Sequence, residues 1–555
     1  MYFHTLTRRQ FCDLTLILNG GFYPLTGFLS QADYECVLSS CRLKNNIIWP
    51  IPIILDVNES IADNLLVNQS IFLRDQENNL IATMIITDIW KPNQLQEAET
   101  IYGTQSNLHP GVCYLLNHTE SIYIGGPVTL IQFPLHIPFY ALQHSPAFLK
   151  DLFLKNKIER VVGFQTRNPM HRAHVELTKR VAAMIDAHIL LHPTVGETKP
   201  GDVDCVTRVK CYQQIMKYYK PHAATLSVIP LSMRMAGPRE ALWHALIRKN
   251  YGCTHFIIGR DHAEPSDGND KNFYSPYAAQ DFTNQFSDEI NIKISCCEVM
   301  HYVKSKNCYL FSSEIEKNTD DIEMISGRAL KNLLHARAEI PLWFSYPEVI
   351  TILQKIYLPK NKQGLTLFFT GLPGSGKSTL AHAMMDQLQA VTDRTLSLLD
   401  GDIFRQISDN RLGFSKRDRD ENVKRIGLMA TEITKHQGIV ICALIAPYAA
   451  TRQWVRNHVT AYGGFIEIYV STPIDVCEAR DPKGHYAKAR LNELKNFTGI
   501  DDPYDVPTHP ELIIDTSSQS LQNCVQTLMH AIAQMGYFDF VRDEVNSCIS
   551  IAVTD

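Results

Sequence analysis

With 555 residues the chain is too long for a single hydrophobic core, and the usual length of about 100–200 residues per domain predicts three or four domains. Hydrophobic residues (45%) and charged residues (20%) occur at fractions typical of globular proteins, which argues against a disordered chain. The formal net charge of -5 argues against nucleic acid as the main partner. No apolar run approaches the roughly 18 residues that a membrane-spanning helix needs, so no membrane partner is expected.

Fourteen cysteines are scattered along the chain without a C-x-x-C pair. Cys296, Cys297 and Cys308 come nearest to a metal-ligand set, but no paired spacing completes a tetrahedral site. Reduced thiols in a cytoplasmic protein are therefore the favoured interpretation.

Residues 1–138 are expected to form a mainly β domain. Short apolar runs rich in Val, Ile and Thr alternate there with Gly, Pro and Asn, which is typical of strands and turns. The segments 20–28 and 109–112 are the most distinctive, and their composition predicts turns. No catalytic role follows from their spacing.

Between residues 139 and 325 strand patterns alternate with helical ones, which predicts a parallel sheet with helical crossovers. In the stretch VVGFQTRNPMHRAH (161–174) a buried strand is followed by four polar residues, and Pro169 predicts a helix start. The i, i+3 spacing puts His171 and His174 on one face of that helix. Arginine and two imidazoles beside a helix N-terminus suggest chemistry on phosphate or sulfate.

Three further polar groups, 192–196, 233–240 and 259–262, also follow strands or lead into a helix in this region. Because parallel strands end at one edge of a sheet, we expect all four groups to line one pocket. The segments 325–334 and 341–356 are expected to be helical, and a polar linker follows them.

The remainder opens with a strand (365–370) followed by GLPGSGKST, a complete phosphate loop. Its glycines let backbone N–H groups face phosphates, Lys377 pairs with the β- and γ-phosphates, and the Ser378 hydroxyl ligates Mg²⁺. After the next strand, Asp400 and Asp402 are candidates for holding Mg²⁺-bound water or accepting a proton. A capping or turn aspartate is the alternative for each alone.

Two charged segments follow. Phe414, within the charged stretch 413–422, suggests a stacking platform, and the basic segment 481–499 suggests a lid over phosphates. A solvated helix surface is the alternative for both.

These motifs resemble two known families. GGFYPLTGF, HPGV, QTRNPMHRAH, HPTVGETKPGDVD, MRMAGPREALWHA and GRDHAEP are similar to motifs of ATP sulfurylases (sulfate adenylyltransferases) over about the first 360 residues. GLPGSGKST, LDGD, GFSKRDRDEN, APYAATR, RDPKG and KNFTGIDDPYD resemble APS (adenylyl sulfate) kinases over 362–535. The resemblance implies an α/β multidomain chain: an N-terminal mainly-β, PUA-like domain (1–138), a Rossmann-like nucleotidyltransferase domain (139–325), a small helical domain and linker (326–360), a P-loop kinase domain (361–537) and a tail (538–555).

For the first activity, the resemblance implies that sulfate attacks the α-phosphorus of ATP and that adenylyl sulfate and pyrophosphate form. The implied catalytic residues are Thr166, Arg167, Asn168, His171 and His174. The implied ATP and sulfate contacts are Gln165, Thr166, Arg167, Asn168, Arg234, Gly259, Arg260, Asp261, His262, Ala263 and His301. Two departures stand out: Glu264 replaces a usual glycine near the anion pocket, and His301 replaces a usual valine beside ATP.

For the second activity, the resemblance implies phosphorylation of the 3′-hydroxyl of adenylyl sulfate to PAPS. Asp402 is the first choice and Asp400 the second for metal or proton handling. The implied ATP site is Gly371, Gly374, Gly376, Lys377, Ser378 and Thr379, and the implied adenylyl-sulfate contacts are Arg405, Phe414, Arg419, Asn422 and Lys483.

Mg²⁺ arriving with ATP is the one cofactor expected. The expected partners are ATP, sulfate and adenylyl sulfate, with neither nucleic acid nor membrane, and the chain is expected to form a homo-oligomer. The alternative is a sulfurylase whose C-terminal part is a non-catalytic, PAPS-sensing module. The intact phosphate loop argues against that alternative.

Overall fold

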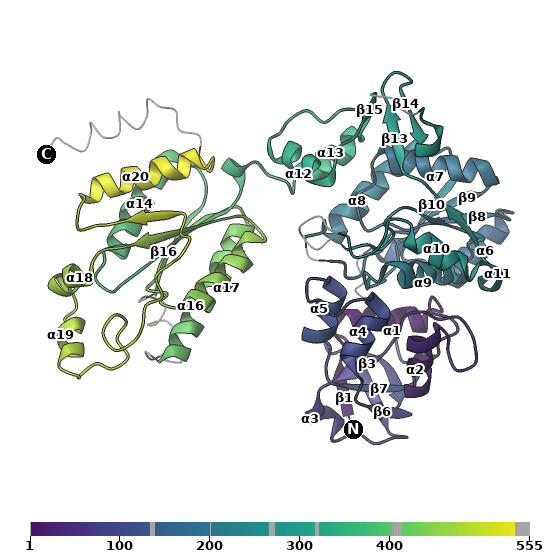
Figure 1. Cartoon of the computed structure of the whole chain (residues 1–555), viewed down its shortest axis with the longest axis horizontal. Helices are drawn as coiled ribbons and strands as arrows, with labels where there is room; N and C mark the ends of the chain where they lie inside the picture. Colours follow the sequence, from purple (N-terminus) through teal and green to yellow (C-terminus); the bar gives the residue numbers. More distant parts are fainter. Residues whose placement is uncertain are drawn as a thin grey trace. The chain divides into compact units, whose positions relative to one another are not determined.

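The computed structural model describes residues 2–133, 139–199, 201–265, 272–316, 321–401, 403, 413 and 415–538. The chain divides into two compact units. The first unit consists of Met1–Leu330 and Glu339–Lys355, and the second consists of Lys331–Ala338 and Ile356–Asp555. Within the described residues, the first unit contains three sheets and the second contains one (Figure 1). No helix in these ranges is long and apolar enough to cross a membrane.

The N-terminal part of the first unit combines a seven-stranded sheet with helices that the sequence interpretation did not include. Helix α1 begins with a capping box, because Thr7 Oγ1 accepts the Gln10 N–H and the Gln10 side chain accepts the Thr7 N–H. His109 Nδ1 accepts the N–H groups of Gly111 and Val112 at the start of α5, so 109–112 is a helix start rather than a turn. The elements are β1 (Tyr2–Thr5), α1 (Arg8–Leu18), β2 (Gly27–Phe28), α2 (Gln31–Ser40), β3 (Leu55–Val57), α3 (Glu59–Ala62), β4 (Ser70–Arg74), β5 (Leu80–Ile85), β6 (Asp88–Trp90), α4 (Gln94–Tyr102), α5 (Pro110–Asn117) and β7 (Ile122–Leu130).

The next part of the first unit is a five-stranded parallel sheet in the order β10-β9-β8-β11-β12, as the alternating pattern predicts. The strand of this sheet that comes first in the chain is β8, and it lies between β9 and β11. The direction in which successive strands are added therefore reverses between β8 and β11. Open α/β sheets bind ligands outside the carboxyl ends of strands at such a switch point. The elements are α6 (Pro146–Lys155), β8 (Val161–Phe164), α7 (Arg172–Ile185), β9 (His188–Leu191), α8 (Cys205–Ile215), β10 (Ala224–Leu226), α9 (Gly237–Asn250), β11 (His255–Ile258), α10 (Ala278–Asn284), α11 (Ser287–Ile290) and β12 (Lys293–Cys296).

A three-stranded antiparallel sheet and two helices follow: β13 (Met300–Val303), β14 (Cys308–Phe311), β15 (Ile322–Glu323), α12 (Gly327–His335) and α13 (Pro347–Gln354). The expectation of a helix over 341–356 is wrong for 341–346. Aromatic contacts hold these residues out of helix: Trp343 stacks on Tyr302 with ring centroids 5.0 Å apart, and Tyr309 Oη donates to the Trp343 carbonyl. Pro347 then occupies the first turn of α13, where a proline is well tolerated.

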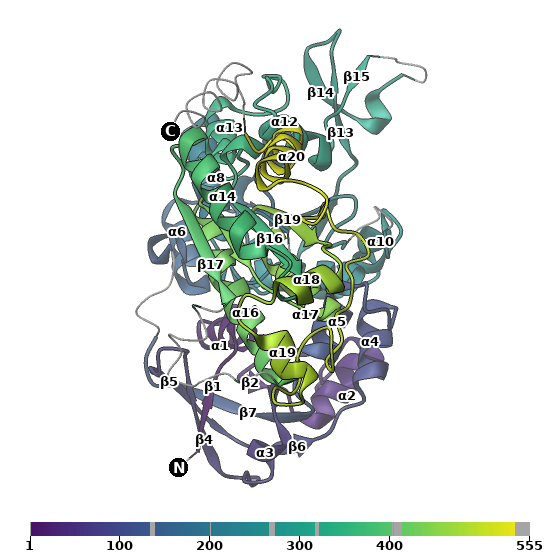
Figure 2. The same cartoon turned by 90° about the vertical axis from the view of Figure 1, so that its left-hand side faces the viewer.

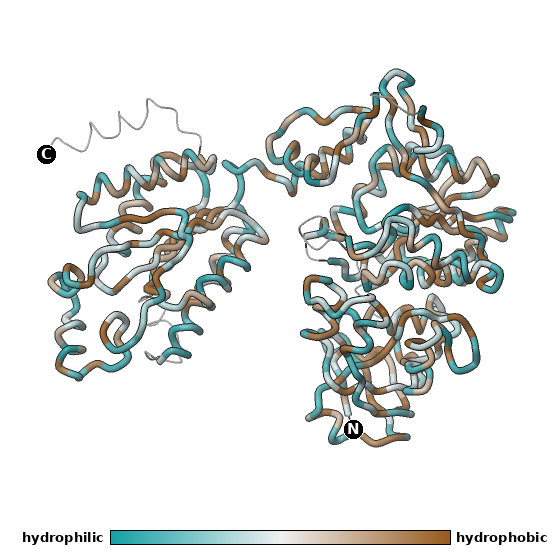
Figure 3. Tube along the Cα trace, in the orientation of Figure 1, coloured by the Kyte–Doolittle hydropathy of each residue, from teal (hydrophilic) through white to brown (hydrophobic). Residues whose placement is uncertain are grey.

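The second unit is a five-stranded parallel sheet in the order β17-β18-β16-β19-β20, with helices on both faces (Figure 2). Along the central strand, Leu367 and Phe369 pack with residues of α14 and α20, whereas Phe368 packs with residues of α16 and α17. Burial on both faces explains the nearly continuous apolar sequence of β16, and Figure 3 shows the hydrophobic strands inside this unit. The elements are β16 (Leu365–Gly371), α14 (Lys377–Val391), β17 (Leu396–Asp400), α16 (Lys416–Lys435), β18 (Ile439–Ala443), α17 (Ala449–Thr460), β19 (Gly464–Val470), α18 (Ile474–Arg480), α19 (His485–Arg490), β20 (Leu512–Ile514) and α20 (Leu521–Gln534).

Candidate functional sites

The polar loop after β8 is held by two buried side chains of α8. Arg208 Nη1 donates to the carbonyls of Arg167 (2.9 Å) and Thr194 (3.0 Å), and Tyr212 Oη donates to the Asn168 carbonyl (2.8 Å). Both side chains are almost completely buried. Sequence reasoning missed them, because an arginine and a tyrosine in a helix carry no signal that they bond a distant loop.

Arg248 of α9 supports the same loop through Gln165. Its Nη2 donates to Gln165 Oε1 and to the His192 carbonyl (2.9 Å). Burial lowers the pKa of Arg248 to about 10, so the guanidinium is still charged at neutral pH. A buried positive charge therefore lies behind the loop that is predicted to bind anions.

Arg167, the predicted charge partner of sulfate, is fixed on two sides. Its Nη2 donates to the Glu264 carbonyl (3.3 Å), and its Nε lies 3.4 Å from Asp202 Oδ2. The two side chains of this ion pair are 13% and 8% exposed. Asp202 comes from the HPTVGETKPGDVD motif and was not predicted as a site residue. It sets the position of the guanidinium at the switch point.

The two histidines lie together at the start of α7, as their spacing predicts. The helix begins at Arg172 rather than at Pro169, because His171 is the N-cap residue and its N–H donates to His174 Nδ1 (3.2 Å). The ring centroids are 6.2 Å apart. Burial, together with the neighbouring ring of His174, lowers the pKa of His171 to about 3, and burial also lowers the pKa of His174. Both rings are therefore neutral near pH 7.

The group 259–263 follows β11 on the other side of the switch point. Asp261 and Ala263 adopt the left-handed backbone region, with φ of 56° and 57°. His262 Nε2 lies 3.0 Å from Nδ1 of buried His244, and Nε2 of His244 lies 3.3 Å from Glu240 Oε1. The sheet order therefore brings this group and the loop after β8 to adjacent strands, as the sequence predicts.

Glu264, Arg234 and His301 make contacts in the structure that the sequence did not indicate. The Glu264 carboxylate accepts the N–H groups of Phe273 (2.7 Å) and Tyr274 (3.1 Å). Arg234 Nη2 binds Asp13 Oδ2 of α1 at 2.5 Å, and its side chain is only 6% exposed. His301 hydrogen-bonds to Ser312 Oγ (3.0 Å). Arg234 and His301 remain predictions as ligand contacts, since their hydrogen bonds are made elsewhere.

In the second unit, the phosphate loop borders a cavity of about 600 Å³. Gly374 and Gly376 have φ of 76° and 96°, and a Cβ on Gly374 would lie 2.9 Å from the Cys477 carbonyl oxygen, so glycine is required there. Tyr486 Oη donates to the Pro373 carbonyl (2.9 Å), which fixes the other side of the loop. The cavity lining also includes Asp400, Arg419, Asn422, Arg480, Lys483 and Phe497.

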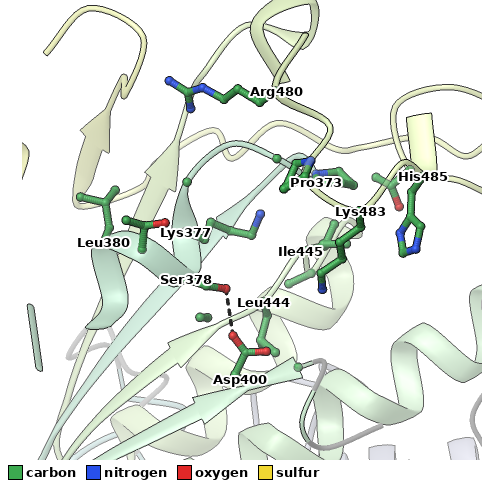
Figure 4. A pocket seen from close by; sticks show the side chains of 18 of the residues that line it. Pro373, Lys377, Ser378, Leu380, Asp400, Leu444, Ile445, Arg480, Lys483 and His485 are labelled. Atoms are coloured by element: carbon green, nitrogen blue, oxygen red, sulfur yellow. Dashed lines mark hydrogen bonds between the residues drawn. The ribbon is translucent and has the colours of Figure 1, made fainter. Parts of the chain in front are cut away.

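Ser378 and Asp400 meet at the floor of this cavity. Ser378 Oγ donates to Asp400 Oδ2 at 2.9 Å (Figure 4). Lys377 Nζ donates to the Leu372 carbonyl at 2.7 Å. Two adjacent oxygen ligands suit a hard cation such as Mg²⁺, which completes its shell with water and substrate phosphates. The side chains present therefore fit the predicted metal.

Arg419 lies deep in the same cavity wall. Its Nη1 donates to Thr498 Oγ1 (2.5 Å), its Nη2 donates to the Asn496 carbonyl, and its Nε is 3.9 Å from Asp502. The cavity thus brings together Lys377, Ser378, Asp400, Arg419, Asn422 and Lys483, all predicted from the sequence. Asp402, Arg405 and Phe414 lie outside the described residues.

Comparison with known proteins finds relatives of both units. Family descriptions match consecutive parts of the chain: a PUA-like domain at 2–133, ATP-sulfurylase at 141–356 and adenylylsulphate kinase at 363–515. A sulfate adenylyltransferase of Mycosarcoma maydis is 45% identical over 531 residues, covering 94% of this chain and 92% of the relative. One of Phaeosphaeria nodorum is 43% identical over 535 residues, covering 96% and 93%.

A solved structure described as a hexameric APS kinase from Thiobacillus denitrificans matches with a TM-score of 0.77 and 31% identity, covering 97% of this chain and 94% of that chain. The fold and the family matches therefore define a nucleotide-dependent transferase in which a sulfurylase domain precedes a kinase domain. The chain belongs to the sulfate adenylyltransferase (ATP sulfurylase) family, with an adenylylsulphate kinase domain in its C-terminal part.

Proposed function

We propose that the chain activates sulfate in two successive reactions. ATP and sulfate give adenylyl sulfate and pyrophosphate in the first unit, and adenylyl sulfate and a second ATP give PAPS and ADP in the second. The observation that carries this proposal is the complete phosphate loop, with Ser378 bonded to Asp400, in a chain that also has the QTRN and H-x-x-H groups. Because adenylyl sulfate forms unfavourably, its removal by a kinase draws the first reaction forward.

In the first unit, Gln165, Thr166, Arg167 and Asn168 bind ATP and sulfate. A planar guanidinium suits a tetrahedral oxyanion, so Arg167 is the main partner of sulfate. His171 and His174 stabilise the charge that develops on the transferred and leaving phosphates. The group 259–263 holds the nucleotide from the adjacent strand, with Ala263 approaching sulfate.

In the second unit, Lys377 and the backbone of the phosphate loop hold the transferable phosphate of ATP. Ser378 and Asp400 would hold Mg²⁺, which would neutralise phosphate charge when bound. Arg419, Asn422 and Lys483 bind adenylyl sulfate. Asp402, Arg405 and Phe414 stay predictions for the same reaction.

The alternative function is a sulfurylase with a non-catalytic, PAPS-sensing second unit. The curated relatives are named only for the first reaction, so the second activity has to be measured. The intact Lys377, Ser378 and Asp400 arrangement favours catalysis, because a sensing module has no need of a loop built for a γ-phosphate.

A coupled assay tests both reactions in one chain. With sulfate, ATP, Mg²⁺ and pyrophosphatase, the wild type should produce PAPS. Lys377→Ala should stop at adenylyl sulfate and keep sulfate-dependent ATP–pyrophosphate exchange. Arg167→Ala should lose that exchange and still phosphorylate added adenylyl sulfate. A wild-type chain that leaves added adenylyl sulfate unphosphorylated would establish the alternative.

We also infer that the chain is a cytoplasmic homo-oligomer. The described cysteines are all free thiols, which suits a reducing compartment. The relative of known structure that covers 97% of the chain is described as hexameric. Light scattering of the purified chain gives the number of subunits.

A further inference from the structure

The segment 343–346 packs against the first turn of α7, where the two histidines lie. The Arg172 N–H donates to the Phe344 carbonyl at 3.2 Å. The Phe344 ring lies 4.7 Å from the His171 ring, and the Arg172 guanidinium lies 4.5 Å from the Tyr346 ring. This segment is the part of the expected helix 341–356 that is not helical, so its irregular backbone is what allows these contacts.

Ser345 makes a polar contact with a site histidine. Its Oγ lies 2.8 Å from His171 Nδ1, and the residue is only 2% exposed. A hydroxyl can donate or accept, but among the described residues His171 Nδ1 is the one acceptor within reach of this hydroxyl. The arrangement that gives the buried hydroxyl proton an acceptor is the one in which the hydroxyl donates, Nδ1 carries the lone pair, and the neutral ring carries its proton on Nε2.

His174 reaches the same tautomer by a different route. Its Nδ1 accepts the N–H of His171, and a backbone N–H can only donate. The proton of the neutral His174 ring is therefore also on Nε2. Within the described part of the chain, neither Nε2 atom has a hydrogen-bond partner, so both N–H groups are available to a ligand.

We propose that Ser345 is a positioning residue for the sulfurylase reaction, and that it and the His171 N–H hold both histidines as neutral Nε2–H tautomers. Each ring then donates a hydrogen bond to a phosphate oxygen and transfers no proton. This inference rests on the proposed sulfurylase function. Donors fixed before the substrate arrives need no reorganisation when charge develops, which is how such groups lower a barrier.

Amide substitutions of His171 distinguish a ring that donates a hydrogen bond from a ring that transfers a proton. In His171→Gln the side-chain N–H₂ reaches about as far as Nε2, whereas in His171→Asn it reaches only about as far as Nδ1. We expect His171→Gln to keep sulfate-dependent ATP–pyrophosphate exchange within about tenfold, and His171→Asn to lose about 100- to 1000-fold in kcat. Equal losses in the two variants would overturn the proposal, because an amide cannot replace an imidazolium acid.

Ser345→Ala tests the positioning role. We expect kcat to fall about tenfold with little change in KM for ATP or sulfate, and Ser345→Thr to restore it because it keeps the hydroxyl. Ser227→Ala is the matched control, since it removes another buried hydroxyl of this unit, one that donates to the Leu142 carbonyl and touches no histidine. Full kcat in Ser345→Ala would overturn the proposal.

A spectroscopic readout is independent of rate. Long-range ¹H–¹⁵N spectra of histidine-labelled protein, assigned with the His171→Gln and His174→Gln variants, should show both rings with a protonated Nε2. In Ser345→Ala, His171 should change to a mixture of tautomers. A protonated Nδ1 in the wild type would overturn the proposal.

The kinase activity of each preparation, measured with added adenylyl sulfate, reports that the second unit is intact, and Ser345→Thr and Ser227→Ala serve as the folding controls for the first unit. A wild type without sulfate-dependent exchange would refute the proposed sulfurylase function itself. A wild type that exchanges normally, with Ser345→Ala indistinguishable from it, would refute only the role of Ser345.

Discussion

Glu264 stands where a negative charge near an anion pocket would be expected to repel sulfate. Its carboxylate instead accepts the N–H groups of Phe273 and Tyr274, and its backbone carbonyl accepts from Arg167. Burial raises the pKa of Glu264, and the two backbone hydrogen bonds oppose that shift. The residue therefore joins two parts of the site wall rather than facing the anion.

Substitution of Glu264 distinguishes these two roles. Glu264→Gln removes the charge and keeps a carbonyl acceptor, so we expect the KM for sulfate not to fall. Glu264→Ala leaves two backbone N–H groups unpaired, each at a cost of roughly 1–3 kcal/mol, and should lower sulfurylase kcat/KM about tenfold or more. Initial rates against sulfate concentration measure both, with kinase activity as the control. A lower KM in Glu264→Gln would show that the charge does repel sulfate.

At the scale of elements, helices α8 and α9 act as the rigid support of the loop after β8. Helix α9 is buried along most of its length, and it presents Arg248 to Gln165. Helix α8 presents Arg208 and Tyr212 to the carbonyls of the same loop. The loop is thus held by side chains from two helices that both follow it in the sequence, and its geometry depends on how those helices pack.

Tyr212→Phe removes one of these supports without changing the ring. We expect a loss of about 1 kcal/mol of stability and a sulfurylase rate about fivefold lower, since the Asn168 carbonyl keeps only the longer hydrogen bond from Thr166 Oγ1 (3.1 Å). Tyr219→Phe is the matched control, because it removes another buried hydroxyl, one that pairs with Thr178 Oγ1 at 2.7 Å and does not touch the loop. Equal falls in rate in the two variants would contradict a specific role for α8.

At the scale of the molecule, the N-terminal sheet and the catalytic sheet of the first unit share one hydrophobic core. Phe22 packs on Trp243 of α9 with ring centroids 5.2 Å apart, and Asp13 pairs with Arg234. The predicted boundary at residue 138 therefore separates two sheets but not two cores. Substitutions in the N-terminal core that shift α9 should therefore alter the sulfurylase site, because α9 carries Arg248.

The first unit also buries several histidines, which makes it sensitive to acid. Burial lowers the pKa of His109 to about 4 and is the main cause that lowers those of His171 and His262 to about 3. The unfolded chain binds protons at these histidines below about pH 6.5 and the folded chain does not, so the free energy of unfolding falls as the pH drops from 6.5 toward 4.

Glu97 opposes this trend, because burial raises its pKa to about 7. Its folded form keeps a proton that the unfolded form loses between pH 4.5 and 7, so its contribution to stability is largest at low pH and is lost as the pH rises through that window. One carboxyl cannot offset three histidines. Together these four groups lower the free energy of unfolding by on the order of 2–3 kcal/mol per pH unit between about pH 6.5 and 4.5.

We therefore expect sulfurylase activity to be lost at a lower temperature at pH 5.5 than at pH 7.5. The measurement is the residual activity at neutral pH after brief heating at each pH, with the kinase activity of the same samples as the comparison. Greater thermal resistance of the sulfurylase at pH 5.5 would contradict the assignment of these histidines as buried and neutral.

The strand–loop–helix units that carry the two candidate phosphate sites could be predicted from the sequence, because each unit is contiguous in the chain. The units β8–α7 and β16–α14 carry their own signals: a buried strand, a polar or glycine-rich loop, and a helical stripe. The two parallel sheets follow from the alternation of such units, and Asp400 could be predicted because it lies at the end of a strand. Strands, loops and helix starts of this kind are determined by consecutive residues, so they can be predicted without knowledge of distant contacts.

Only the tertiary structure decided which distant residues complete the first site. Arg208, Tyr212, Arg248, Asp202 and Ser345 reach it through the order of the strands and the burial of α8 and α9, and none has a spacing that points to a ligand. The same reason explains the start of α7 at Arg172 and the irregular segment 341–346. The Arg172 N–H donates to the Phe344 carbonyl, and the ring of Trp343 stacks on that of Tyr302, so both features depend on residues far away in the chain. Such partners are known only once the chain has folded.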